Sequence, residues 1–118
     1  MEKKAALISL AALAQETRLD IFRLLVERGP AGLAAGDVAT GLGLPPATTS
    51  FHLKELRRAG LITFRRAGRS LIYAADFAAM NGLVGYLTEN CCTDGCAPSR
   101  AARPARQLET PDLEEIPS

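Results

Sequence analysis

The stretch GLGLPP, residues 41–46, limits the fold more than any other part of this 118-residue chain. Its glycines and prolines predict a tight turn, and helical sequence lies on both sides of it. A short helix is predicted at residues 37–42. A second helix begins at Pro46, which suits a first helical turn, and ends at Gly60, which is placed to cap it. The chain is therefore predicted to contain two consecutive helices joined by a turn.

The segments LITFRR and SLIYAA follow, and both are rich in residues that favour β-strands. They flank Ala67, Gly68 and Arg69, a sequence typical of a β-hairpin. A short helix, a turn, a second helix and a basic hairpin occur in that order in a winged helix-turn-helix, whose second helix reads DNA in the major groove. The predicted fold is mainly α with a β-hairpin wing (α+β).

Three further helices or helix ends can be predicted. Residues 4–14 are apolar nearly all round, so this helix must be buried on more than one side, and a partner subunit is one way to bury it. The next helix is predicted to have Thr17 as its N-cap and to stop at Gly29 and Pro30. A last helix spans roughly residues 76–90, with apolar residues at helical spacing.

The length and composition fit one soluble globular domain. We expect a domain at residues 1–96 and a disordered tail at residues 97–118, which hold four of the seven prolines and no aromatic residue. No apolar run approaches the ~20 residues of a membrane span, and the N-terminus lacks a convincing signal peptide. The expected location is the cytoplasm, with no membrane partner.

The net charge of +1 hides a basic middle, because residues 46–75 carry six bases against one acid. A basic run is usually only a solvated face, and a lone histidine is more often a surface or capping residue than a base reader. The agreement of element order, turn and charge instead favours double-stranded DNA as a partner. The candidate DNA-binding residues are Thr48, Thr49, Ser50, Phe51, His52, Lys54, Arg57, Arg58, Arg65, Arg66 and Arg69.

These candidates have different expected roles. The short polar side chains and His52 lie early in the recognition helix, where they reach base edges or phosphates. Phe51 lies about 200° around the helix from Leu53, so it should point away from the core, either toward a thymine methyl or against the wing. Lys54 and the two arginines that follow are better placed for phosphates, and the wing arginines for the flanking backbone or a minor groove.

All three cysteines, Cys91, Cys92 and Cys96, lie within six positions after the last predicted helix. Three thiolates select soft, thiophilic ions. We expect the adjacent pair to point in different directions, with a turn at Thr-Asp-Gly bringing Cys96 back to close a three-sulfur site. Zinc prefers four ligands, although Asp94 or a partner residue would complete a set for zinc, cadmium or lead. A disulfide between Cys92 and Cys96 is a further alternative, so metalloid, redox and incidental roles all stay open on the residues alone.

An enzyme is not predicted. An arsenate reductase with a phosphate-type cysteine loop needs an arginine six residues after its cysteine, and here those positions hold Ala97, Pro98 and Ala102. No catalytic set or catalytic cofactor site is evident elsewhere.

The stretches ALAQETRLDIFRLLVE and DVATGLGLPPATTSFHLKELRRAGLITFRRAGRSLIYAA resemble the ArsR/SmtB family of metal- and metalloid-responsive repressors. The resemblance covers about residues 5–92. It implies a homodimer, built from the first and last helices, that binds an inverted-repeat operator without inducer and releases it when inducer binds.

The resemblance also bears on the inducer. The frequent arsenite site of the family places cysteines at the start of the helix before the recognition helix, but residues 34–42 contain none. The cysteines here follow the last helix, as in a smaller arsenite-responsive group. The resemblance therefore implies trivalent arsenic, As(III), or antimony, Sb(III), as inducer at Cys91, Cys92 and Cys96. Methylated trivalent arsenic needs only two thiolates and competes as a candidate, and a thiol-redox or soft-metal response is the alternative function.

Overall fold

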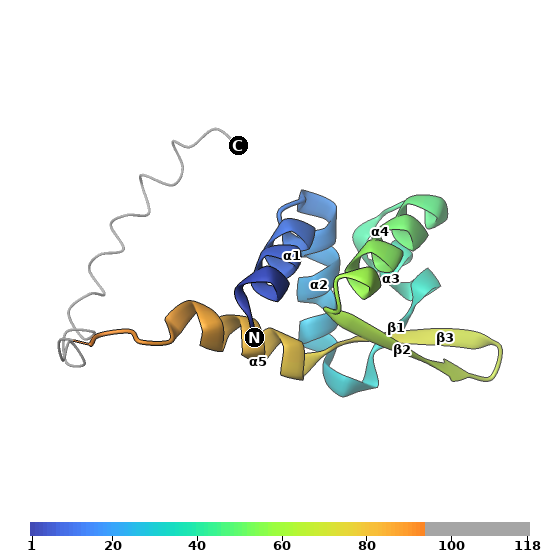
Figure 1. Ribbon diagram of the computed structural model, residues 1–118. Helices are drawn as coiled ribbons and strands as arrows, with labels where there is room; N and C mark the ends of the chain where they lie inside the picture. Colours follow the sequence, from blue (N-terminus) through green and yellow to red (C-terminus); the bar gives the residue numbers. More distant parts are fainter. Residues whose placement is uncertain (94–118) are drawn as a thin grey trace, which may run out of the picture. The chain divides into compact units, whose positions relative to one another are not determined.

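The computed structural model describes residues 1–93 and has the predicted winged helix-turn-helix fold (Figure 1). The predicted tail and Cys96 lie outside the described residues. In chain order the elements are α1 (Lys3–Leu13), α2 (Glu16–Arg28), the 3-10 turn η1 (Gly29–Ala31), β1 (Leu33–Ala34), α3 (Ala35–Leu42), α4 (Pro46–Arg58), β2 (Ile62–Ala67), β3 (Ser70–Ala75) and α5 (Phe77–Thr88). Within this part of the chain, no helix is long and apolar enough to cross a membrane.

The helix ends follow local chemistry. The prediction of Thr17 as the N-cap of α2 is wrong, because the side chain of Gln15 accepts a hydrogen bond from the backbone N–H of Arg18 at 2.8 Å. Gly60 ends α4 as predicted: its φ of 81° lies in the left-handed region, and the Leu61 amide bonds back to the Leu56 carbonyl at 3.1 Å. This closure turns the chain directly from the recognition helix into the wing.

The wing is a three-stranded antiparallel sheet in the order β1-β3-β2, with Phe64 opposite Tyr73. The hairpin was predicted, but β1 was not, because a strand of two residues has no readable alternation. Gly32 precedes β1, and a Cβ there would overlap the carbonyl oxygen of Tyr73. Glycine therefore allows β1 to approach β3 closely.

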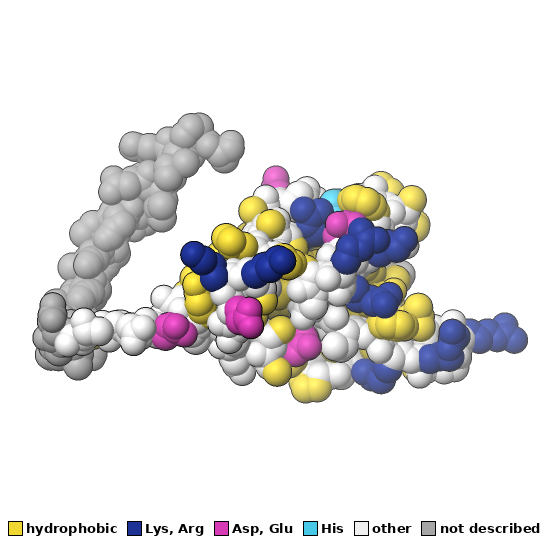
Figure 2. Space-filling view, in the orientation of Figure 1, with side chains coloured by type: hydrophobic (Ala, Val, Ile, Leu, Met, Phe, Trp, Pro, Cys, Tyr) yellow, Lys and Arg dark blue, Asp and Glu magenta, His cyan; other side chains and the backbone are white. Residues whose placement is uncertain are grey.

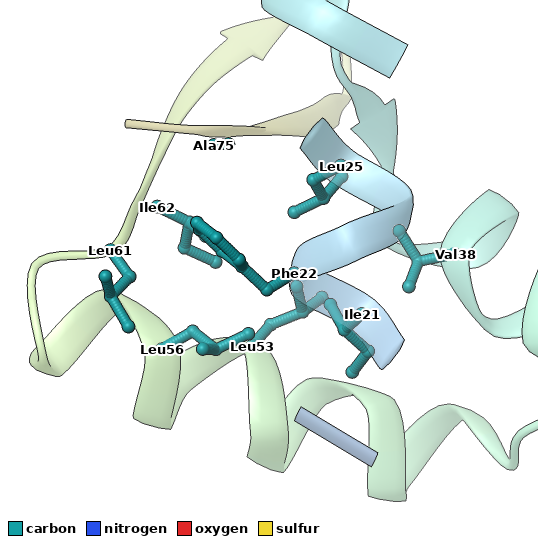
Figure 3. Packing of buried hydrophobic residues seen from close by; sticks show 9 residues of the cluster. All are labelled: Ile21, Phe22, Leu25, Val38, Leu53, Leu56, Leu61, Ile62 and Ala75. Atoms are coloured by element: carbon teal, nitrogen blue, oxygen red, sulfur yellow. The ribbon is translucent and has the colours of Figure 1, made fainter. Parts of the chain in front are cut away.

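The core joins α2, α4 and the start of the wing (Figure 3). Ile21 and Leu25 of α2 are fully buried and pack in one cluster with Leu53 and Leu56 of α4. Leu61, at the exit from α4, completes this contact and is also fully buried. The recognition helix is thus held to the body of the domain by its inner face.

Leu53→Ala should lower the free energy of unfolding by about 3 kcal/mol, because it removes a side chain that is 1% exposed and leaves a cavity. Phe51→Ala, on the same helix but 55% exposed, should cost less than about 1 kcal/mol. Urea denaturation at one fixed protein concentration measures both. Equal losses in the two variants would contradict the assigned inner face of α4.

Candidate nucleic-acid interface and thiol site

The rotation of α4 about its axis decides which side chains it offers. Thr49, Leu53 and Leu56 are spaced by four and three residues and are at most 1% exposed, so they form one inward stripe. Ser50 and Lys54 are exposed and lie about 100° around the helix from this stripe. This side of α4 is free for a partner within the described part of the chain.

Thr49 requires a correction. It was predicted to bind DNA, but it is buried, and its hydroxyl donates to the carbonyl oxygen of Pro45 at 3.1 Å. Its side chain therefore satisfies the first turn of the helix and has no surface for a base. Thr48 is half-buried, while Phe51 is 55% exposed and points away from the core as predicted.

An aromatic and cationic stack joins α4 to the wing. The Arg57 guanidinium lies 4.2 Å from the centre of the Phe64 ring, and Phe64 stacks on Tyr73 with ring centres 6.0 Å apart. Such contacts hold a cation over a π face and reduce its freedom. Neither aromatic residue was among the predicted site residues, although their cross-strand pairing follows from the hairpin register.

A hollow lies between α4 and the wing, lined by Ser50, Phe51, Lys54, Arg57 and Tyr73. Its walls carry two cations, two aromatic rings and a short hydroxyl. These groups suit a phosphate backbone with its adjoining sugars and bases. The structure thus gathers four of the predicted DNA-binding residues around one concave surface.

Lys and Arg side chains gather over α4 and the hairpin, on the right-hand side of Figure 2. Arg58 pairs with Glu55 at 3.0 Å, and Arg65 donates to the Ala31 carbonyl at 3.2 Å. Both contacts are solvent-exposed and weak. Within residues 1–93, Lys54, Arg66 and Arg69 are exposed and make no ion pair, so they keep their charge available for an anionic partner.

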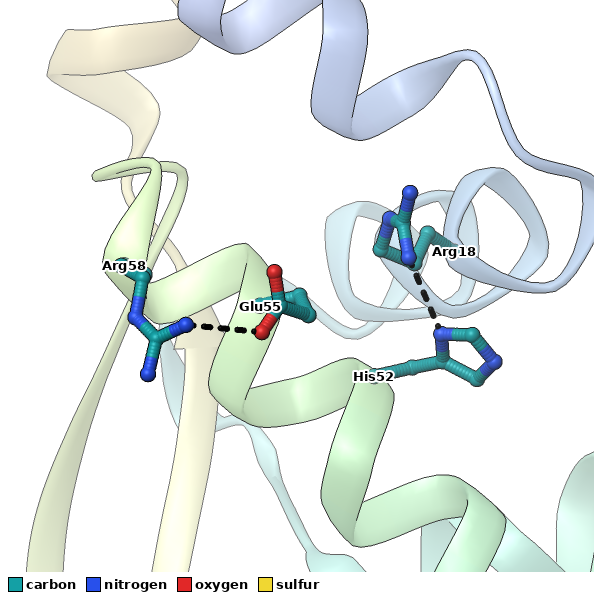
Figure 4. A network of polar contacts seen from close by, with 4 residues as sticks. All are labelled: Arg18, His52, Glu55 and Arg58. Atoms are coloured by element: carbon teal, nitrogen blue, oxygen red, sulfur yellow. Dashed lines mark hydrogen bonds and ion pairs between the residues drawn. The ribbon is translucent and has the colours of Figure 1, made fainter.

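His52 is half-buried beside Arg18 of α2 (Figure 4). Arg18 Nη1 lies 3.3 Å from His52 Nδ1. Burial and the nearby Arg18 charge lower the pKa of His52 below its ordinary value, and the Glu55 carboxylate opposes this shift. The imidazole is consequently neutral at pH 7.

The described thiols differ from the expected arrangement. Cys91 and Cys92 were expected to point in different directions, but their sulfurs are 2.9 Å apart, and both residues are exposed. The reason is backbone conformation: Asn90 and Cys92 have φ angles of 63° and 59°, so the chain leaves the helical path and brings adjacent side chains together. Cys91 is a free thiol, while Cys92 is disulfide-bonded.

The predicted third ligand, Cys96, is outside the described range. Among residues 1–93, no three His, Cys, Asp or Glu side chains are grouped closely enough to hold a metal ion. Cys91 is a free thiol and Cys92 is disulfide-bonded, so these two sulfurs can hold one thiophilic atom together only after the disulfide is reduced.

Comparison with known proteins gives the family. Residues 13–64 match the model of a helix-turn-helix domain. The chain is 30% identical over 94 residues to the transcriptional activator HlyU of Vibrio cholerae, covering 78% of this chain and 84% of that protein. The solved structure of reduced HlyU has a TM-score of 0.60 at 28% identity, over 75% of this chain and 90% of that one.

Two further solved structures are similar. An ArsR-like transcriptional regulator from Rhodococcus sp. RHA1 has a TM-score of 0.65 at 28% identity, over 89% of this chain and 92% of that one. Mb0332 from Mycobacterium bovis, described as a homodimeric winged helix-turn-helix domain and a possible ArsR-family regulator, has a TM-score of 0.58 at 28% identity, over 75% and 86% of the two chains. The chain therefore belongs to the ArsR/SmtB family of winged helix-turn-helix transcriptional regulators, which are DNA-binding proteins and not enzymes.

Proposed function

We propose that this regulator is a homodimeric repressor that binds operator DNA in its inducer-free state and is released by trivalent arsenic or antimony. The observation that carries the proposal is the pair of exposed sulfurs of Cys91 and Cys92, 2.9 Å apart. A third thiol, Cys96, follows four positions later in the sequence. Three thiols so close along the chain match a soft, three-coordinate inducer.

Trivalent arsenic can be bound by three thiols and needs no fourth ligand. Arsenous acid, As(OH)₃, reacts with three thiols to form three As–S bonds and releases three molecules of water. The arsenic keeps its lone pair, so the product is a trigonal pyramid. Zinc instead prefers four ligands, and the one histidine of the chain lies on α4 beside Arg18. A methylated trivalent arsenical needs only two thiolates, which Cys91 and Cys92 supply once the Cys92 disulfide is reduced.

The homodimer is supported by exposed apolar side chains on the first and last helices. On α1 these are Leu7 and Ile8, which are 59% and 48% exposed, and on α5 they are Val84 and Leu87, which are 54% and 57% exposed. Apolar area of this kind favours burial against a partner. The description of Mb0332 as homodimeric agrees with this assignment. Two copies of α4 related by a twofold axis require an inverted-repeat operator.

In the complex, we assign base contacts to Thr48, Ser50, Phe51 and His52 at the start of α4. Lys54, Arg57 and Arg58 bind phosphates further along the helix. Arg65, Arg66 and Arg69 on the wing bind the flanking backbone or a minor groove. Thr48 and His52 are half-buried and the other side chains of this set are exposed, which together with the hollow between α4 and the wing supports the assignment.

A thiol-redox response is the second candidate, because Cys92 is disulfide-bonded and the relative HlyU has been solved in a form named as reduced. In this scheme peroxide takes two electrons and two protons from two thiols, which yields one disulfide and two molecules of water. DNA release would then need no metalloid.

Lys54→Ala and Arg66→Ala should each weaken binding to all DNA sequences by a similar factor, because phosphate contacts carry no sequence information. Because a homodimer loses one phosphate contact in each subunit, each substitution should also reduce the slope of log K against log salt by about 2. The tightest-binding duplex is first selected from a randomised inverted-repeat pool. Fluorescence anisotropy then measures the affinity of each variant for this selected duplex and for a scrambled duplex. Loss confined to the selected duplex would contradict the phosphate role.

Arsenite should release the selected duplex from the wild-type protein, and Ser substitution at Cys91, Cys92 or Cys96 should abolish the response. Thr93→Ala, an adjacent substitution without a thiol, is the control and should respond normally. The titration is made after reduction with a phosphine, since dithiol reductants themselves bind arsenic. Cys96→Ser should still respond to monomethylarsonous acid, which needs two thiolates. Unchanged arsenite release in the three variants would contradict the site.

The redox scheme makes a separate prediction. Peroxide should release DNA from the wild type without arsenic, and a reductant should restore binding. Non-reducing mass spectrometry should then find a two-proton loss in the peptide containing the cysteines. Peroxide treatment that leaves DNA affinity unchanged, while arsenite still releases DNA, would assign the thiols to metalloid binding alone.

A further inference from the structure

His52 is the one histidine of the chain, and it contacts the side chain of Arg18, which is also bound to the end of α1. Arg18 of α2 contacts His52 Nδ1 through Nη1 at 3.3 Å, and its Nε donates to the Ala12 carbonyl in the last turns of α1 at 2.7 Å. Figure 4 shows the Nδ1 edge of the imidazole turned toward Arg18 and the Nε2 edge turned away from it. One guanidinium therefore links the end of α1 to the recognition helix.

The chemistry of the two groups fixes the position of a proton. A guanidinium offers five N–H donors, has no acceptor and stays protonated in proteins. His52 Nδ1 must therefore accept the hydrogen bond, because Arg18 cannot. A neutral imidazole that accepts at Nδ1 carries its proton at Nε2, where it is a donor.

The charges around His52 favour the neutral ring. Arg18 from α2 and Glu55 from α4 are the charged groups that act on it, with opposite effects on its pKa, and burial adds to the effect of Arg18. Above its lowered pKa the ring is neutral and accepts from Arg18. As the pH falls through that pKa, Nδ1 takes up a proton, and the contact with Arg18 is lost.

We propose that Arg18 is a positioning residue for DNA recognition, which holds His52 as the Nε2–H tautomer so that position 52 meets DNA as a hydrogen-bond donor. The inference rests on the proposed function in one respect, namely that His52 contacts the operator. A donor fits phosphate oxygens and the acceptor atoms of bases, such as guanine N7 and O6 or thymine O4, and it opposes the amino groups of adenine and cytosine. The bond to Ala12 in turn holds Arg18 in place.

The tautomer is tested directly on the DNA-free protein. Because the chain has one histidine, ¹⁵N-histidine labelling gives the signals of a single imidazole. In the wild type, the ¹⁵N shifts should show a protonated Nε2 and an unprotonated Nδ1, with a pKa below the ordinary histidine value. Arg18→Met should mix the two tautomers and raise the pKa, because a positive charge and a donor are lost. Arg23→Gln, at an exposed position on the same helix, is the control and should change neither.

DNA-binding measurements on variants at positions 52 and 18 distinguish the need for a donor at position 52 from the need for the contact with Arg18. The substitution His52→Gln places an amide N–H donor near the position of Nε2. His52→Asn places its amide near the position of Nδ1, where its carbonyl oxygen can accept from Arg18 but its N–H groups do not reach the position of Nε2. Affinity for the selected duplex should fall about tenfold in His52→Asn and in Arg18→Met, and less than about threefold in His52→Gln. Arg18→Lys keeps the charge and should recover part of the loss. Circular dichroism of each variant confirms that it is folded.

The outcomes distinguish the inference from the proposed function. Unchanged ¹⁵N shifts and pKa in folded Arg18→Met would overturn the role of Arg18. Wild-type affinity in His52→Asn would overturn the donor at position 52, whatever arsenite does. Failure of arsenite to release DNA would contradict the proposed inducer and leave the tautomer and affinity results as they stand.

Discussion

The packing of α4 on α2 is the contact on which the rest of the structure depends. Three inward side chains, Thr49, Leu53 and Leu56, set the rotation of the recognition helix. A rotation of one residue, about 100°, would bury Ser50 and Lys54 in place of this stripe. Every polar or charged group that α4 offers to DNA is therefore fixed by apolar contacts on its other side.

The charged face has two kinds of cation. Arg57 is held over Phe64, so its position is restricted before any partner arrives, whereas the exposed pair of Arg58 with Glu55 restricts Arg58 only weakly. Lys54, Arg66 and Arg69 carry long, exposed side chains, and they lose more conformational entropy on binding than Arg57 does. The ordered cations suit a defined register on DNA, and the unrestrained ones suit sequence-independent attraction to phosphate. In the proposed complex, the short polar residues and His52 are left for sequence discrimination.

The element order and the wing could be predicted from the sequence because glycine, proline and hydrophobic spacing act locally. The same spacing places Thr49 four residues before Leu53 and seven before Leu56. The periodicity therefore predicts the burial of Thr49, whereas its residue type alone favours a contact with DNA.

The contact between Arg18 and His52 cannot be predicted from the sequence, because it joins residues 34 apart and depends on the packing of α2 against α4. The N-cap at Gln15 was missed because glutamine ranks below threonine at that position. The approach of the Cys91 and Cys92 sulfurs could not be predicted, because it goes with a left-handed φ at Cys92, a residue type that rarely adopts it; the left-handed Asn90 is common after a helix end.

These left-handed residues also bear on how an inducer acts in the proposed mechanism. Asn90 adopts the left-handed region readily, but Cys92 held there costs on the order of 1–3 kcal/mol, so the turn competes with continuation of α5 along a helical path. An inducer that bonds to the sulfurs of both Cys91 and Cys92 needs the two side chains close together, so it would favour the turn over continuation of the helix. A ligand shifts a conformational equilibrium only by its difference in affinity between the two states. A hundredfold to ten-thousandfold loss of DNA affinity needs a difference in inducer affinity between the two states of about 3 to 5.5 kcal/mol. In the proposed mechanism, the two-state element would be the C-terminal end of α5, which is either extended as helix or ended by the turn at Asn90 and Cys92.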